Sequence, residues 1–155
     1  MPEAEPAVGE IRLAHDSSAA HGVPAHITVL FPFLAPAAVD EDALQGLFAA
    51  FEPFDFTLDR VEGFDDGLVW LHPHPTRPFV DLTAAVAQRW PEAPPYEGAF
   101  DEVIPHLTVS EVPLDLSLPL PLAARAREVV LIEEDEASRR WSVRRRFPLG
   151  QSGVA

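Results

Sequence analysis

The pattern of apolar and polar positions divides the chain into strand-like and helix-like segments. Residues 54–59 alternate aromatic or aliphatic side chains with Asp or Thr, which is the pattern of a strand with one buried face. A turn at residues 63–67 separates this segment from a second apolar run at residues 68–72. Together the two runs predict an antiparallel hairpin.

Two longer segments space their apolar residues three and four positions apart, as amphipathic helices do. Residues 39–51 form the first, with Asp40 placed to cap its N-terminus and Pro53 to end it. Residues 79–90 form the second, which ends at Pro91. We therefore expect two helices, one on each side of the hairpin in the sequence.

The remaining segments are shorter and complete a predicted order β-α-β-β-α-β-β-β. Residues 1–10 are acidic, contain two prolines and are expected to be extended or mobile, whereas residues 14–22 have the composition of a capped loop. Further strands are predicted at residues 23–34, 103–110, 128–133 and 140–147, and a short helix at residues 122–127. This order predicts an α+β fold with mainly antiparallel sheets.

Two of the predicted strands carry the same motif. The heptapeptide VPAHITV recurs eighty positions later as VIPHLTV, so that His-x-Thr-Val appears twice. Because side chains alternate along a strand, His26 and Thr28 are expected on one face, and so are His106 and Thr108. Each strand would bury an aliphatic face and present an imidazole and a hydroxyl on the other.

Composition narrows the classes of function. The 155 residues suit one domain with a proper core. The absence of cysteine excludes disulfides, a thiolate zinc site and a thiol nucleophile. No apolar run has the length of a membrane span and the first residues do not resemble a signal peptide, so we expect a cytoplasmic protein that does not contact a membrane.

The charge balance bears on the partners. Against 25 acidic residues stand 11 basic ones, which are all arginine, and the net charge is -14. A long nucleic-acid duplex or an anionic membrane needs a basic face, so neither is an expected partner. A small anionic substrate or a short RNA end, held locally in a cleft, remains compatible with this charge; no oligomeric state is predicted.

Paired imidazoles suit a reaction that needs an acid and a base together. One histidine can accept a proton while the other donates one, as attack on a phosphodiester requires. The hydroxyls of Thr28 and Thr108 can donate hydrogen bonds to non-bridging phosphate oxygens. Neither a metal ion nor a cofactor is required, and none is predicted.

The HITV and HLTV motifs, each behind Val and Pro, resemble the paired motifs of the two-histidine (2H) phosphoesterases, within the 2′-5′ RNA ligase-like group. The runs SSAAHGVPAHITVLFPFL, PFDFTLDRVEGF and PPYEGAFDEVIPHLTV are also similar to bacterial members. The resemblance implies a single bilobal domain over residues 1–155. Its two lobes, related by a pseudo-twofold axis, would each contain an antiparallel sheet with packed helices, and the motifs would face each other across a central cleft.

The resemblance also implies an activity: hydrolysis of 2′,3′-cyclic phosphates, or reversible 2′-5′ ligation of RNA ends. Our leading hypothesis is metal-independent hydrolysis of a 2′,3′-cyclic phosphate of a nucleotide or short RNA end. His26 and His106 would be the acid–base pair, with His106 favoured as base, and Thr28 and Thr108 would hold the phosphate. The alternatives are ligation and a non-catalytic module that binds a phosphate-bearing ligand.

The sequence departs from the family pattern at two places. Bacterial ligases often follow the second motif with a basic pair, whereas Ser110 and Glu111 stand here, and a carboxylate beside a phosphate pocket weakens the ligation hypothesis. The family also usually opens with an apolar strand, for which the first residues of this chain offer no counterpart. Either that strand is absent or the chain starts downstream of the usual position, and loss of the strand would leave a position in one sheet unfilled.

A second set of residues is considered for substrate binding. Phe31, Phe33 and Tyr96 flank the motifs and could stack on a nucleobase, although core packing is the alternative. Arg144 and Arg146 are expected on one face of the last strand, where they could bind phosphate. The alternative for this pair is a solvated edge that discourages strand addition.

His72 and His74 are two positions apart, and histidines at alternate positions of a strand can bind one metal ion together. The neighbouring prolines indicate a strand that ends in a loop, and no third ligand is evident. We expect both histidines to be solvated loop residues.

Overall fold

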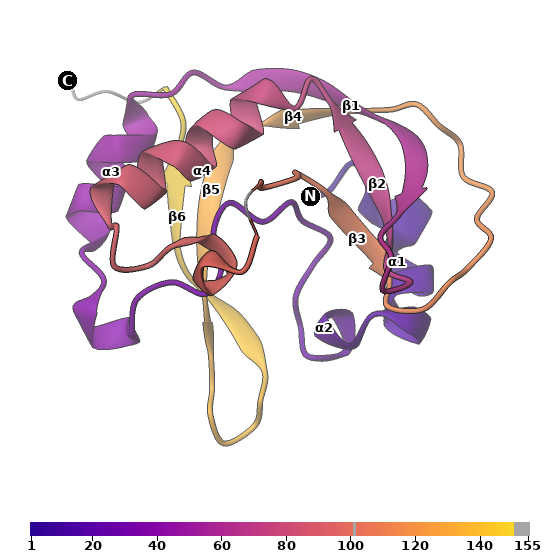
Figure 1. Cartoon of the computed structure of the whole chain (residues 1–155), viewed down its shortest axis with the longest axis horizontal. Helices are drawn as coiled ribbons and strands as arrows, with labels where there is room; N and C mark the ends of the chain where they lie inside the picture. The colour runs from indigo at the N-terminus through magenta and orange to yellow at the C-terminus, as the bar shows by residue number, and fades with distance from the viewer. Residues whose placement is uncertain (101, 151–155) are drawn as a thin grey trace.

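The computed structural model describes residues 1–100 and 102–150 and contains two antiparallel sheets. Four strands form the larger sheet in the order β3-β2-β1-β4, and β5 and β6 form the smaller one (Figure 1). The elements in chain order are α1 (Glu5–His15), α2 (Ser17–Ala20), η1 (Pro36–Ala38), α3 (Glu41–Ala49), β1 (Phe54–Gly63), β2 (Val69–His74), α4 (Arg77–Arg89), η2 (Pro95–Gly98), β3 (Leu107–Ser110), β4 (Leu122–Ala126), β5 (Glu128–Glu134) and β6 (Trp141–Pro148).

The hairpin of β1 and β2 forms the centre of the larger sheet and confirms the prediction from alternation. Leu58 pairs with Pro73 and Arg60 pairs with His72, so that Asp59 is an extra residue in β1, a β-bulge. The bulge changes which residues face the core. Leu58 is buried before it, whereas Arg60 after it is exposed.

Helix α1 covers one face of the larger sheet, at the right of Figure 1, and forms the first core with it. Ala4 and Val8 are fully buried there against Leu107 and Val109. The expectation that residues 1–10 are extended is therefore wrong. Ala4, Val8 and Arg12 lie four positions apart and form the buried stripe of a helix, but an arginine in that stripe hides it from a hydrophobic pattern.

The second core lies between the smaller sheet and the helices α3 and α4, at the left of Figure 1. Both helices are close to their predicted ranges, and the Asp40 side chain caps α3 by accepting a hydrogen bond from the Ala43 amide at 3.0 Å. Phe48 of α3 packs on Phe147 of β6, with ring centroids 5.8 Å apart. The α+β class, the antiparallel sheets and the two lobes are thus confirmed.

Two predicted elements have a different structure. Residues 122–127 were expected to be helical, but Leu122–Ala126 is strand β4, which pairs with β1. The segment that carries the first motif was expected to be a strand, but it contains bends and belongs to no sheet. Alternation within a short segment does not show whether a partner strand lies beside it, because pairing is non-local.

An apolar cavity of about 820 Å³ opens beside this unpaired segment. Val29 of the first motif lines it, together with Leu131 and Ile132 of β5. Within the described part of the chain, β5 pairs only with β6, so its other edge is open. The cavity therefore lies beside this open edge of the smaller sheet. None of the described helices is long and apolar enough to cross a membrane.

Candidate active site

The second motif is positioned by regular strand pairing. In β3, Thr108 lies opposite Trp70 of β2 and Leu107 lies opposite Leu71. Leu107 and Val109 are fully buried under α1. The alternation of side chains then directs His106 and Thr108 to the opposite face of the sheet, as the sequence predicted for this copy.

His106 is held by one hydrogen bond and two aromatic rings. Its Nδ1 lies 2.7 Å from the carbonyl oxygen of Ile104. The rings of Phe64 and Trp70 meet the imidazole edge to face, with centroids at 5.2 and 5.9 Å. Phe64 also stacks on Trp70 at 4.8 Å, so the three rings form one packed group. This packing limits the rotation of the imidazole.

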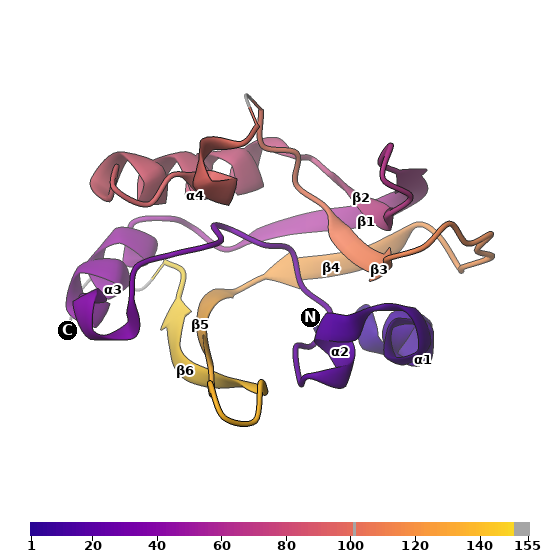
Figure 2. The same ribbon diagram turned by 60° about the horizontal axis from the view of Figure 1, so that its bottom comes forward.

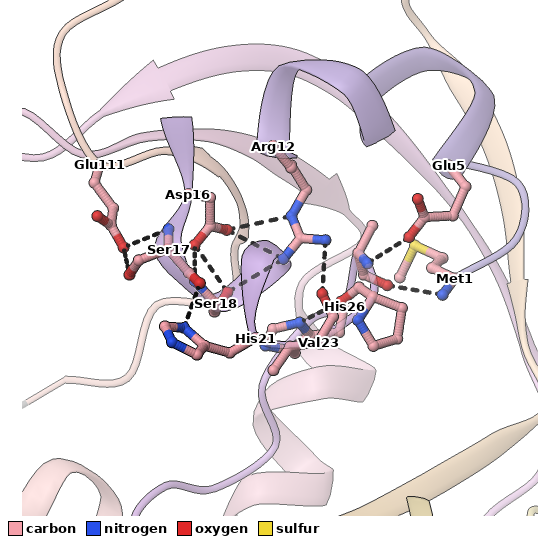
Figure 3. A network of polar contacts seen from close by, with 12 residues as sticks. Met1, Glu5, Arg12, Asp16, Ser17, Ser18, His21, Val23, His26 and Glu111 are labelled. Atoms are coloured by element: carbon pink, nitrogen blue, oxygen red, sulfur yellow. Dashed lines mark hydrogen bonds and ion pairs between the residues drawn. The ribbon is translucent and has the colours of Figure 1, made fainter. Parts of the chain in front are cut away.

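The first motif is positioned by side chains instead of a sheet, as Figure 3 shows. Arg12 of α1 donates from Nη1 to the carbonyl of Val23 at 3.0 Å. Ala25 donates its amide to Oε1 of Glu5 at 2.6 Å, and its carbonyl accepts from the Met1 nitrogen at 2.7 Å. These contacts replace the hydrogen bonds that a neighbouring strand would supply.

A further contact holds the other end of the first motif. The hydroxyl of Thr83, a buried residue of α4, donates to the carbonyl of Val29 at 2.6 Å. The segment is therefore attached at one end to α1 and at the other to α4, the helices of the two lobes.

Arg12 belongs to a buried ion pair. Only 2% of the residue is exposed, and Nε and Nη2 donate to Oδ2 of Asp16 at 3.2 and 3.1 Å. The other carboxylate oxygen of Asp16 accepts a hydrogen bond from the amide of Ser18 and so caps α2. One ion pair thus connects α1, α2 and the first motif.

His26 has the same local hydrogen bond as His106. Its Nδ1 lies 2.8 Å from the carbonyl oxygen of Pro24, two residues earlier, just as that of His106 contacts Ile104. Because a carbonyl only accepts, Nδ1 carries the hydrogen in both rings, and Nε2 of the neutral ring is left as an acceptor. Burial lowers the pKa of His26, although the hydrogen bond to Pro24 opposes this effect.

The two motifs adjoin through their apolar residues. Ala25 and Ile27 of the first segment pack in the same core as Leu107 and Val109 of β3. In both overall views the segment between α2 and α3 runs between β3 and β5 (Figures 1 and 2). His26 and Thr28 also line the apolar cavity. The structure therefore brings the two copies of the repeat to neighbouring segments.

The aromatic candidates lie at the border of this region. Phe31 is 51% exposed and meets Trp141 edge to face at 6.3 Å. Phe33 instead packs against Trp90 in the second core, the alternative considered for it. The Tyr96 amide donates to the Phe31 carbonyl at 2.7 Å, and burial raises the pKa of its phenol. Phe31 is thus the aromatic candidate that presents most surface to a ligand.

The two arginine candidates do not share a face. In β6, Arg145 pairs with Leu131 and Val143 with Ile132, so Arg144 is an extra, bulged residue. The expectation of one common face is therefore wrong, because the bulge shifts the alternation. Arg144 holds Glu41 of α3 at 2.9 Å, whereas Arg146 lines the cavity.

Arg146 itself donates to Glu128 at 2.6 Å. Each of the two arginine candidates thus has a carboxylate partner, and neither is a ready cation for a phosphate.

The expectation of solvated loop histidines is wrong for His72. It lies within strand β2, only 16% of its side chain is exposed, and its Nδ1 is 2.8 Å from Oδ1 of Asp59. His74 at the end of the strand is exposed. In the described part of the chain no three His, Asp or Glu residues are grouped so as to hold a metal ion.

Glu111 does not lie free beside a phosphate pocket. Its carboxylate accepts hydrogen bonds from the amide and hydroxyl of Ser17 at 3.0 and 2.5 Å (Figure 3). Its amide donates to the carbonyl of His15 at 2.9 Å. The residue that weakened the ligation hypothesis therefore connects β3 to the α1–α2 junction.

Several residues of the site were missed by reasoning from sequence. Glu5 lies in the segment expected to be extended, Arg12 lies just after it in a stretch with no predicted element, and Phe64 and Trp70 were assigned only to the hairpin. A usable signal did exist for one of them, since Arg12 and Asp16 have the i,i+4 spacing of a helical ion pair.

The family model described as the 2′-5′ RNA ligase superfamily matches residues 1–146. The structure of Escherichia coli LigT with NADP+ is 20% identical, covers 97% of this chain and 93% of that chain, and has a TM-score of 0.62. The structure of LigT with 3′-AMP is 19% identical, covers 92% of this chain and 93% of that chain, and has a TM-score of 0.55.

TT0787 of Thermus thermophilus is 22% identical, covers 83% of this chain and 81% of that chain, and has a TM-score of 0.57. No curated protein sequence matches the chain significantly. These identities indicate a common fold, and the match to the family model covers nearly the whole chain. The chain belongs to the 2′-5′ RNA ligase superfamily, a group of 2H phosphoesterases.

Proposed function

We propose that the chain is a metal-independent phosphoesterase that hydrolyses the 2′,3′-cyclic phosphate of a nucleotide or a short RNA end. The observation that carries this proposal is the matched state of His26 and His106. Each Nδ1 is bound to the carbonyl two residues earlier, which leaves each Nε2 available to exchange a proton. A threonine follows each histidine by two positions.

The proposed reaction needs one neutral and one protonated imidazole. Water attacks phosphorus and gives a proton to the neutral imidazole, while the protonated imidazole gives its proton to the ribose oxygen that leaves. One P–O bond forms, one breaks, and a nucleoside monophosphate results. Thr28 and Thr108 donate hydrogen bonds to the non-bridging oxygens, where negative charge increases in the transition state.

The structure bears on which histidine is the base. Burial lowers the pKa of His26 and so favours its neutral form, which is the form of a base. This supports His26 as base and His106 as acid in hydrolysis, the reverse of the assignment favoured from sequence. In a pH–rate profile of kcat/KM, substitution of the base removes the acidic limb.

Small phosphate-bearing ligands suit this family. The similar structures of E. coli LigT contain 3′-AMP or ATP. An acidic chain of net charge -14 is better suited to such ligands than to a long duplex. We expect the same class of ligand here.

Ligation remains the second candidate. In the sequence Glu111 counted against it, but the position of Glu111 in the structure removes this objection. Its carboxylate is engaged by Ser17. Incubation of an RNA 2′,3′-cyclic phosphate end with a 5′-hydroxyl end tests this, because the ligase reaction is the reverse of transesterification at the same phosphorus.

The test of hydrolysis uses purified protein and the four 2′,3′-cyclic mononucleotides, with product measured by chromatography. His26→Ala and His106→Ala should each lower kcat about 10²–10⁴-fold. Circular dichroism verifies that both variants fold, and a chelator should change nothing. Wild-type rates in both variants contradict the mechanism. Tight binding of a cyclic nucleotide without product indicates a binding module.

A further inference from the structure

The sheet face that carries the second motif continues across β2. Trp70 lies directly opposite Thr108, and Leu71 lies opposite Leu107. His72 lies two positions from Trp70, and His106 lies two positions from Thr108, so both histidines are on the face of this Trp70–Thr108 pair. The indole of Trp70 touches both imidazoles, with centroids 6.2 Å from His72 and 5.9 Å from His106.

The bulge at Asp59 supplies a partner for His72. Arg60 is paired with His72 across the hairpin, and the extra residue Asp59 is positioned to accept from His72 at 2.8 Å. A carboxylate accepts, so Nδ1 of the neutral ring carries the hydrogen and Nε2 is an acceptor. Among residues 1–100 and 102–150, nothing hydrogen-bonds to this Nε2.

The charges around His72 indicate what it can bind. Arg60, the nearby cation, lies 3.5 Å from Asp59 and 2.5 Å from Glu62. Burial would raise the pKa of Asp59, but the hydrogen bond from His72 and the charge of Arg60 lower it, so the carboxylate stays ionised. The surroundings of His72 thus hold two carboxylates, Asp59 and Glu62, and one arginine that is already paired with both. Such surroundings disfavour binding of a further phosphate and favour a neutral group that donates a hydrogen bond.

We propose that Nε2 of His72 accepts a hydrogen bond from the nucleoside whose phosphate lies at His106, with Asp59 as the positioning residue. The donor is a sugar hydroxyl or a base amino group. This proposal rests on the proposed function and specifies the substrate further. The substrate would be a nucleoside cyclic phosphate that carries no second phosphate where it contacts β2. Asp59 fixes the tautomer, because its carboxylate accepts the hydrogen of Nδ1.

The first experiment substitutes His72→Asn, which keeps a donor near the position of Nδ1 and has no atom at the position of Nε2. Loss of one hydrogen bond should raise KM for 2′,3′-cyclic AMP roughly threefold to tenfold with kcat within about twofold. His72→Gln should recover part of the loss. His74→Asn, the same change two positions along the strand, is the matched control and should leave KM unchanged.

Substrate analogues identify the donor. One analogue lacks the 5′-hydroxyl and another lacks the base amino group. The analogue that lacks the contacted group should bind equally well to wild type and His72→Asn, whereas the other should retain the difference. Equal KM values for wild type and His72→Asn with every substrate overturn the proposal, as does a fall in kcat alone.

The tautomer is tested without turnover. Nitrogen-15 NMR should show His72 protonated at Nδ1 and bare at Nε2, and Asp59→Asn should populate the other tautomer. A ring protonated at Nε2 in the wild type overturns the proposal. If no cyclic phosphate is hydrolysed, the proposed function fails separately. The same His72→Asn comparison is then made by calorimetry with 3′-AMP, where an unchanged affinity overturns the proposal.

Discussion

The two copies of the His-x-Thr motif have the same local geometry but different supports. Each histidine has Nδ1 within 2.8 Å of the carbonyl oxygen two residues earlier. The second copy lies in the four-stranded sheet, whereas the first belongs to no sheet and is held by polar side chains of α1 and α4. A repeated motif therefore specifies the orientation of its imidazole more strongly than the secondary structure around it.

The difference predicts opposite sensitivities. The first copy depends on charged and hydroxyl groups, so polar substitutions should damage it. The second depends on buried aliphatic residues and aromatic contacts, so loss of apolar volume should damage it. The predictions below test this contrast, beginning with the largest expected effect.

Arg12→Met should have the largest effect on stability. It leaves the Asp16 carboxylate buried without its cation and removes the donor to the Val23 carbonyl. Breaking such a buried pair costs about 3–5 kcal/mol of unfolding free energy. Urea denaturation measures the loss, and Arg77→Met is the control.

Arg77 forms an ion pair of the same i,i+4 spacing with Asp81, but on the exposed surface. Its removal should cost at most about 0.5 kcal/mol. Equal losses for the two arginine variants would show that burial of the Arg12 pair is not what supports the first motif.

Leu107→Ala should damage the second copy. Leu107 is fully buried between α1 and the sheet, and its truncation leaves a cavity that costs about 3 kcal/mol. Leu13→Ala, at an exposed position of α1, should cost less than about 0.5 kcal/mol. Histidine NMR adds a local measurement: the signals of His106 should shift more than those of His26, and the reverse order would contradict the contrast.

The contrast also explains which parts of the structure could be predicted. The hairpin and the helices α3 and α4 follow from local periodicity, because each has a continuous apolar face and clear end signals at Asp40 or at prolines. Helix α1 was missed because its buried stripe includes Arg12. The first motif was assigned to a strand because VPAHITV alternates in the same way whether or not a partner strand is present.

The motif residues of the candidate site could be predicted from the sequence, but the residues that surround them could not. His26, Thr28, His106 and Thr108 stand out as a repeat in the sequence alone. Trp70 and His72 join the face of His106 only through the register of β2 with β3, and Asp59 reaches His72 only through a bulge. Register and bulges are set by non-local pairing, which no local pattern contains.

The pH dependence of stability should distinguish the two copies further. Burial lowers the pKa of His26 in the folded protein, so the unfolded chain binds more protons between that lowered value and the ordinary value near 6.5. Stability is therefore fully present above about pH 6.5 and is lost as the pH falls through the folded pKa of His26. His26→Asn should flatten the decline that sets in below about pH 6.5 in thermal or urea unfolding. An unchanged decline would show that burial of His26 does not cause it.

Thr83→Val should have the smallest effect. It keeps the shape of the side chain and removes the donor to the Val29 carbonyl, which should cost about 1 kcal/mol of unfolding free energy. Thr83→Ser retains the hydroxyl and serves as the matched variant. Because Val29 directly follows Thr28, we also expect kcat for a cyclic phosphate to fall severalfold in Thr83→Val and to be largely retained in Thr83→Ser. A greater loss of kcat in Thr83→Ser would show that packing of α4, and not this hydrogen bond, positions the first motif.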